Sequence, residues 1–156
     1  MIAEELDDVT HGRVESLSSE GNALVEAGDL AGALKMYGRA LKLLPEPIHR
    51  WEAATWLFTA LGDVLFLERK YREAKDALNE AMRCPNAIGN PFIHLRLGQA
   101  NYELKEIDCA KDELARAYIG GGDELFEGED PKYKLFIKEI LRPEQGVATT
   151  RVFPNR

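Results

Sequence analysis

The sequence predicts an all-α protein in which three helical hairpins stack into a solenoid that a final helix closes. Three observations predict this class. One pattern of small and apolar residues occurs three times, turn-forming residues separate the two halves of each copy, and prolines separate the copies from one another. The chain has 156 residues, 45% of them hydrophobic and 30% charged, which is the composition of one globular domain with its own core.

The repeated pattern consists of a glycine, an alanine, an apolar residue and a second alanine. The offsets between them are 12, 4 and 3 residues in all three copies. The copies are Gly21, Ala33, Tyr37 and Ala40; Gly62, Ala74, Leu78 and Ala81; and Gly98, Ala110, Leu114 and Ala117. Small residues on both helices of a hairpin let the two backbones approach closely. The apolar residue fills the seam, because positions i, i+4 and i+7 share one helical face.

The pattern divides residues 1–142 into repeats of a single domain. The repeats cover about residues 14–46, 47–88 and 90–122. The first two glycines are 41 residues apart, and residues 47–54 predict about two extra helical turns ahead of the second unit, with Trp51 packed against the first hairpin. The next interval is 36 residues, and its extra length predicts a longer loop at residues 84–90.

A closing helix is predicted after the third unit. Three consecutive glycines, 120–122, predict a hinge or a helix terminator. Asp130 is a good N-cap and Pro131 a good first residue, so a helix is expected at about residues 130–141. A solenoid needs such a helix to cover its last apolar face. Residues 143–156 contain Pro, Gly, Thr and scattered charges and are predicted to form a loose tail.

These repeats resemble the tetratricopeptide repeat family over about residues 14–122. The family signature runs W-x2-L-G-x2-Y, then A-x3-F, then P. Signature positions are filled by Leu17, Gly21, Leu24, Ala33, Tyr37, Ala40 and Pro45, by Phe58, Leu61, Gly62, Leu65, Ala74, Leu78 and Ala81, and by His94, Leu97, Gly98, Ala110, Leu114 and Ala117. Glu20 and Asn101 depart from the signature. The resemblance implies a right-handed solenoid in which the first helix of each hairpin lines a concave, protein-binding side.

Two segments carry a second, narrower resemblance. Residues 89–99 and 126–133 resemble a group of bacterial tetratricopeptide proteins, and this likeness spans about residues 50–142. Proteins of that group are encoded with polymorphic toxins and are thought to act as their immunity partners. The resemblance implies a protein that binds a toxin domain inside the cell and blocks its active site or the approach of its substrate.

Helical phase locates the residues on the concave side, which we call the stripe. Residues two before or one after the core-facing positions point away from the core by roughly 100 to 200 degrees. The stripe comprises Glu15, Ser18, Asn22 and Val25, then Glu52, Trp56, Thr59, Asp63 and Phe66, then Phe92, Leu95, Gln99 and Tyr102. Its partner-binding candidates are Asn22, Glu52, Trp56, Thr59, Asp63, Phe66, Phe92, Gln99 and Tyr102.

Aromatic residues rimmed by charges have the composition of an interaction hot spot. The alternative is that these aromatic residues pack between neighbouring hairpins or under the closing helix. Family members that clamp the acidic C-terminal tails of chaperones do so with Lys, Arg and Asn on this stripe, where Asn22 is the single match. The sequence therefore does not predict that clamp.

No constellation in the sequence points to catalysis, and we expect no enzyme activity, cofactor or metal. His11, His49 and His94 lie far apart, and His94 falls at a core-facing position. Cys84 and Cys109 lack C-x-x-C spacing and are predicted to be small buried residues. The triple glycine is not followed by the Lys-Ser or Lys-Thr of a phosphate-binding loop.

The net charge of the chain indicates which class of partner it can bind. The chain has 20 Lys and Arg residues against 27 Asp and Glu residues, a formal net charge of −7, which favours a basic protein surface over nucleic acid. No apolar stretch could span a bilayer, the acidic start does not resemble a signal peptide, and two cysteines suggest a reducing compartment, so a cytoplasmic protein is expected. The predicted function is neutralisation of a bacterial toxin, and the alternative is a structural adaptor or chaperone-like scaffold; the sequence leaves the oligomeric state open.

Overall fold

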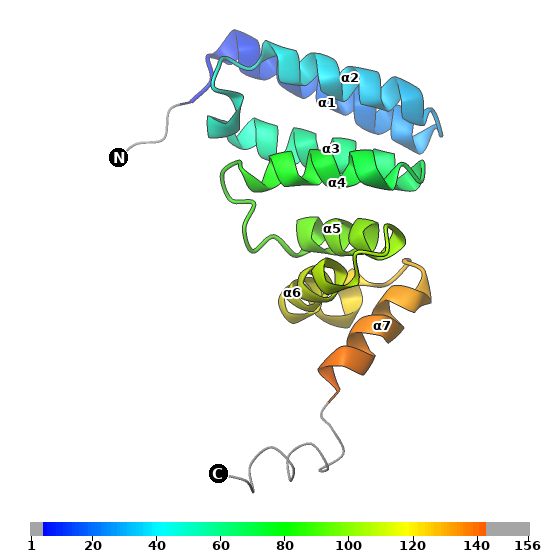
Figure 1. Cartoon of the computed structure of the whole chain (residues 1–156). Helices are drawn as coiled ribbons and strands as arrows, with labels where there is room; N and C mark the ends of the chain where they lie inside the picture. The colour runs from blue at the N-terminus through cyan, green and yellow to red at the C-terminus, as the bar shows by residue number, and fades with distance from the viewer. Residues whose placement is uncertain (1–4, 143–156) are drawn as a thin grey trace, which may run out of the picture.

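The computed structural model describes residues 5–142, and every regular element in this range is a helix. The elements are α1 (Asp8–Glu26), α2 (Leu30–Leu43), the 3-10 turn η1 (Ile48–Arg50), α3 (Glu52–Leu67), α4 (Tyr71–Met82), α5 (Pro91–Glu103), α6 (Ile107–Leu125) and α7 (Pro131–Leu141). Helices α1 and α2, α3 and α4, and α5 and α6 pair as hairpins, which stack in chain order and end at α7 (Figure 1). The predicted all-α solenoid is confirmed.

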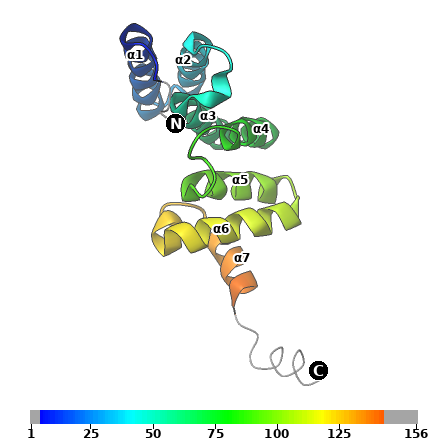
Figure 2. The same cartoon turned by 90° about the vertical axis from the view of Figure 1, so that its left-hand side faces the viewer.

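Helix α5 occupies the most enclosed position in this stack. In the side view it lies between the second hairpin and α6 (Figure 2). Nine consecutive residues of α5, from Ile93 to Asn101, are buried, including the polar and charged ones. A helix buried on every side has no solvent-facing stripe. This position determines what becomes of the candidate residues on α5.

The three hairpins turn in the same way. After the first helix of each hairpin the backbone adopts a left-handed conformation, at Gly28 (φ 85°), Arg69 (φ 63°) and Lys105 (φ 64°). The next amide donates a hydrogen bond of 2.8 to 2.9 Å to the carbonyl oxygen five residues earlier, which closes the helix end as a Schellman motif. Because this conformation costs a residue with a side chain roughly 1 kcal/mol, packing of the hairpins must hold Arg69 and Lys105 in it.

Each hairpin closes where its repeated glycine faces the following helix. A Cβ atom built on Gly62 would lie 2.4 Å from Cγ of Leu78, and the same clash would occur at Gly21 and Gly98. All six alanines of the pattern are fully buried. The close approach of the two backbones that the pattern predicts is therefore present in all three hairpins.

The segment ahead of α3 differs from the predicted two extra helical turns. Residues 48–50 form one 3-10 turn, and Trp51 is extended (φ −95°, ψ 134°), so α3 begins only after it. The indole N–H of Trp51 donates to the carbonyl oxygen of Pro45 at 2.7 Å, and its ring joins Val14 and Tyr37 in the core of the first hairpin. The prediction of an elongated helix is wrong, but the predicted packing of Trp51 is right.

The C-terminal end agrees with the predicted closing helix. Helix α6 continues to residue 125, beyond the predicted end of the third unit, with a kink at Gly122 (φ 65°, ψ −164°). The carboxylate of Asp130 then accepts the amide of Lys132 at 3.0 Å and caps α7, which Pro131 begins. The predicted tail at residues 143–156 lies outside the described residues.

Gly62→Ala should lower the free energy of unfolding by about 1–3 kcal/mol, because the added methyl group collides with Leu78 and overpacks the seam. Gly12→Ala is the matched control. Gly12 lies on the exposed side of α1 with no atom within 4 Å of an added Cβ, so the same change should raise stability by about 0.5–1 kcal/mol through helix propensity. Urea unfolding measures both values, and equal effects would contradict the close approach at Gly62.

Candidate protein-binding surface

On α1 and α3 the predicted stripe is accessible in part. Contrary to the prediction, Ser18 is buried and its hydroxyl donates to the carbonyl oxygen of Val14, and Phe66 packs within the chain. Asn22 and Glu52 are exposed, and Trp56 keeps 41% of its surface exposed although its ring is large and apolar. Thr59 is half-buried, and its hydroxyl donates to the carbonyl oxygen of Thr55 at 2.6 Å. We call Asn22, Glu52, Trp56 and Thr59 the open part of the stripe. It presents one exposed aromatic ring among polar groups.

Neighbouring side chains hold two of these polar groups in place. The amide oxygen of Asn22 accepts the phenol hydrogen of Tyr37 at 2.6 Å, and the carboxylate of Glu52 accepts the amide of Asn86 at 2.9 Å. Burial, followed by the nearby charge of Asp63, raises the pKa of Tyr37 above its ordinary value. Two polar groups of the open part, Asn22 and Glu52, are therefore held by hydrogen bonds within the chain.

Asp63 marks the boundary of the open part because it binds a buried arginine. Nε of Arg96 donates to Asp63 at 2.6 Å, and Nη1 donates to both Gln99 and Glu129 at 2.6 Å. The amide of Gln99 donates to the same oxygen of Glu129 at 2.7 Å. Glu129 belongs to the loop that leads into α7. Arg96 thus joins α3, α5 and this loop through charge-assisted hydrogen bonds.

The guanidinium of Arg96 also lies between two aromatic rings. Its central carbon is 4.8 Å from the ring centre of Phe66 and 5.0 Å from that of Phe92. Burial alone would lower the pKa of Arg96, but the charges and hydrogen bonds of Asp63 and Glu129 outweigh it and raise that pKa above its ordinary value. The charge is retained in the interior because two carboxylates compensate it.

Helix α7 covers the remaining aromatic residues of the stripe. The ring centre of Tyr102 lies 5.4 Å from that of Tyr133 and 5.1 Å from that of Phe136, both on α7. Phe66 also contacts Tyr133, at 6.4 Å between ring centres. The phenol of Tyr133 donates to Glu103, and burial together with this carboxylate raises the pKa of Tyr133 well above its ordinary value. The aromatic groups form one cluster under the closing helix.

Phe66, Phe92, Leu95, Gln99 and Tyr102 form the covered part of the stripe. The assignment of Leu95 to an accessible side is wrong, because Leu95 has no exposed surface and belongs to the core. Gln99 has no exposed surface, and the three aromatic residues are half-buried in contacts within the chain. For these aromatic residues the structure agrees with the alternative stated from the sequence, in which they pack within the chain under the closing helix. Sequence reasoning missed Arg96 and Glu129, which lie 33 residues apart in the chain. The one local sign of this network in the sequence is Arg96 itself, a charged residue on a helix that is otherwise expected to face the core.

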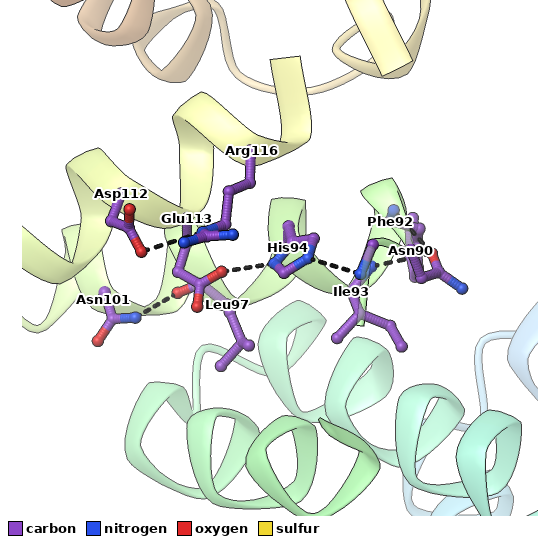
Figure 3. A network of polar contacts seen from close by, with 10 residues as sticks. Asn90, Phe92, Ile93, His94, Leu97, Asn101, Asp112, Glu113 and Arg116 are labelled. Atoms are coloured by element: carbon purple, nitrogen blue, oxygen red, sulfur yellow. Dashed lines mark hydrogen bonds and ion pairs between the residues drawn. The ribbon is translucent and has the colours of Figure 1, made fainter. Parts of the chain in front are cut away.

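Beside the stripe, His94 lies in a buried polar network (Figure 3). Its Nε2 accepts the amide hydrogen of Gly89 at 3.2 Å, which assigns the ring hydrogen to Nδ1, 2.6 Å from the carboxylate of Glu113. Both ring nitrogens are therefore engaged. The expected core-facing position of His94 is confirmed, and the network ties the loop before α5 to α6.

The cysteines differ from each other. Cys84 is buried, its thiol lies 3.3 Å from the carbonyl oxygen of Glu80, and burial raises its pKa. Cys109 is exposed on α6, contrary to the prediction, because it lies on the outer side of that helix.

Between residues 5 and 142, no group of three His, Cys, Asp or Glu side chains is arranged to hold a metal ion. In the same range no helix has the length and apolar character needed to cross a membrane.

Comparison with known proteins identifies the fold. The first tetratricopeptide domain of Spaghetti (RPAP3), bound to the HSP90 peptide SRMEEVD, superposes with a TM-score of 0.62 at 19% identity, covering 83% of this chain and 93% of that one. The second such domain of human RPAP3, in complex with the HSP70 peptide SGPTIEEVD, gives 0.63 at 17% identity, covering 86% and 99%.

The N-terminal domain of stress-induced protein-1 from C. elegans gives a TM-score of 0.61 at 18% identity, covering 86% of this chain and 98% of that one. No protein-family profile and no curated protein sequence matches the chain. At these identities the likeness shows the fold, and the chain has the fold of a tetratricopeptide repeat domain.

Glu129→Ala should loosen the segment from residue 126 to the end of α7, because it removes one of the two carboxylates that compensate Arg96. We expect faster amide hydrogen exchange in that segment and a loss of about 2–4 kcal/mol in stability. Glu139→Ala is the control, because its ion pair with Arg142 is exposed and should contribute about 0.5 kcal/mol at most. Unchanged exchange in Glu129→Ala would contradict the role of Arg96 in holding the loop.

The attachment of α7 should weaken in acid. Burial alone would raise the pKa of Glu103, but hydrogen bonds from Lys132 and Tyr133 lower it below the ordinary 4.5. Its contribution to stability is therefore present above pH 4.5 and lost as the pH falls through the lowered value. The stability difference between the wild type and Glu103→Gln, from urea unfolding at neutral pH and near the lowered pKa, should shrink in acid. The exposed Glu127→Gln serves as control, and a pH-independent difference for Glu103→Gln would contradict the attachment.

Proposed function

We propose that this protein is a non-catalytic binding module that holds a protein partner against the open part of the stripe. The observation that carries the proposal is Trp56, a large ring 41% exposed on α3, while the other aromatic residues of the stripe pack within the chain. A rigid aromatic side chain among polar groups is typical of an interaction hot spot. Asn22, Glu52, Thr59 and, at the boundary, Asp63 form its rim.

The structural neighbours support a binding role, but the partner that suits this chain differs in charge from the acidic peptides in the RPAP3 complexes. The RPAP3 domains occur in complexes with peptides that end in Glu-Glu-Val-Asp. In this chain Glu52 and Asp63 contribute carboxylates to the stripe, and the cation beside Asp63, Arg96, is buried and paired. Since like charges repel across an interface, a basic partner fits this surface better than an acidic peptide.

The partner we favour is a bacterial toxin domain, which would make the protein an immunity protein acting in the cytoplasm. The narrower resemblance over residues 50–142 and the net charge of −7 support this proposal. A toxin that cleaves nucleic acid needs a basic surface for its substrate, and an acidic inhibitor would compete for that surface. Binding alone would then neutralise the toxin without chemistry by the inhibitor.

The second candidate is a structural adaptor or chaperone-like scaffold with two partners. A separate apolar surface on α7 favours it. Leu135 is 70% exposed and borders a shallow hollow lined by Tyr102, Lys132, Phe136 and Ile140. An adaptor would use this surface and the open part of the stripe at the same time.

Affinity purification from the source organism, followed by mass spectrometry, tests the two candidates. One stoichiometric partner that is toxic when produced alone, and harmless when this chain is co-produced, would support the immunity proposal. A partner that is harmless alone, or several weakly bound partners, would favour the adaptor. The same purification with Trp56→Ala serves as the surface control.

Trp56→Ala should weaken binding of that partner by about 2 kcal/mol, roughly 30-fold, without lowering the melting temperature. Phe66→Ala provides the contrast. Phe66 contacts Arg96, Tyr71 and Tyr133 inside the chain, so its loss should lower stability by about 2–4 kcal/mol. Isothermal titration and thermal unfolding separate the two effects. Full affinity in Trp56→Ala would exclude the open part of the stripe as the binding surface.

A further inference from the structure

The loop between α4 and α5, residues 84–90, carries the most exposed large apolar side chain among the described residues. Ile88 is 79% exposed. Single exposed apolar residues are common on protein surfaces and need no explanation by themselves. Ile88 is different because the loop that presents it is fixed on both sides, and because this loop is longer than the repeat spacing requires.

One side of the loop is fixed to α3. The hydroxyl of Thr55 donates to the carbonyl oxygen of Pro85 at 2.7 Å, and the amide of Asn86 donates to the carboxylate of Glu52 at 2.9 Å. Thr55 is buried, so its hydrogen bond is shielded from water. These bonds attach the first half of the loop to the beginning of α3, in the turn that carries Trp56.

The other side of the loop is fixed to α5 and α6. The amide of Gly89 donates to His94, which in turn donates to Glu113 on α6 (Figure 3). The side-chain oxygen of Asn90 caps α5, and the backbone N–H of Asn90 donates to the carbonyl oxygen of Ala87 at 3.0 Å. Ala87 itself is 1% exposed and packs in the core. The residues on both sides of Ile88 are thus anchored, and Ile88 is the exposed large apolar side chain of the loop.

The loop backbone also contains two residues in the left-handed conformation. Asn86 (φ 61°) and Gly89 (φ 89°) enclose Ala87 and Ile88. Asparagine and glycine are the residues that adopt this conformation at least cost. The composition of the loop therefore suits one defined shape rather than a set of shapes.

We propose that Ile88 is a preorganised anchor that inserts into an apolar socket on a basic, folded protein partner, with Glu52 facing a cation at the rim of that socket. The contact surface, which we call the edge surface, consists of Glu52, Trp56, Asn86 and Ile88. It lies where α3 begins, and the α4–α5 loop is on the same side of the stack, at the left in Figure 1. This inference rests on the proposed function and adds the loop to the open part of the stripe.

Two physical arguments support the anchor. An apolar side chain on a fixed loop loses little conformational freedom on binding, so more of its burial contributes to affinity. The charge of Glu52 and the net charge of −7 favour a partner with Lys or Arg beside its socket, and such complementarity speeds association. An acidic or nucleic-acid partner would meet repulsion at the same place.

Site-specific photocrosslinking in the source organism tests the surface with the full chain. The photoreactive residue p-benzoylphenylalanine replaces Ile88, Trp56 or, as a matched control, Ile119, which is 78% exposed on α6. We expect positions 88 and 56 to crosslink to the same protein and position 119 not to do so. A crosslink at 56 without one at 88 overturns the anchor and leaves the proposed function standing. No crosslink at either position overturns both, and a crosslink to a second copy of the chain overturns the basic partner.

Affinity measurements with the purified crosslinked protein complete the test, since capture alone does not establish the anchor. Ile88→Asp should weaken binding at least tenfold, while Ile119→Asp changes it less than twofold. Glu52→Gln should reduce the association rate and its dependence on salt. Equal effects of Ile88→Asp and Ile119→Asp, or a crosslink mapped to an acidic face of the partner, would overturn the inference.

A further variant tests whether the fixed shape of the loop at residues 84–90 contributes to affinity. Thr55→Val removes the hydroxyl that holds Pro85 but leaves the edge surface unchanged. We expect faster hydrogen exchange in residues 84–90 together with several-fold weaker binding. Faster exchange with unchanged affinity would show that the rigidity of the loop does not contribute, and would overturn that part of the inference.

Discussion

The absence of a side chain at three positions is the constraint on which the rest of the structure depends. Gly21, Gly62 and Gly98 each leave space that a ring or a leucine of the following helix fills, with less than 3 Å to an added Cβ. Backbones that approach this closely form thin, regular hairpins, which then stack face to face. Because the stack is tight, α5 is enclosed on all sides, and an arginine on it must find its partners inside the protein.

Arg96 finds these partners in Asp63 and Glu129, and its contacts divide the stripe into its open and covered parts. Its bonds to Asp63 and Glu129 draw the loop before α7 against α3 and α5, and Phe66 and Phe92 enclose the guanidinium. The domain resembles peptide-binding tetratricopeptide domains in the path of its helices. In this chain the cation on the last hairpin, Arg96, is paired with carboxylates of the same chain. The accessible part of the stripe thus lies on the first two hairpins and ends at Asp63.

The repeat and the closing helix could be predicted because both leave local signatures. Small residues at fixed offsets mark the seams, and Asp130 with Pro131 marks a helix start. Helical phase also placed Trp56 correctly on an accessible face. Phase could not distinguish Trp56 from Gln99, because burial of Gln99 depends on Glu129, which reaches it from a distant loop. The extended Trp51 escaped prediction for a similar reason, since its hydrogen bond to Pro45 competes with a helical pattern that the sequence favours locally.

The division of the stripe separates residues that pack in the interior from residues on which the seams of the hairpins do not depend. Each member of the covered part contributes to packing or to the Arg96 network, so a change there affects folding as well. Glu52 and Trp56 keep most of their chemistry at the surface, and the seams do not depend on them. Mutation at these positions can therefore alter recognition at little cost to folding. A lineage of such proteins could follow a changing partner by exchanging a few side chains on α3 while the same hairpins persist.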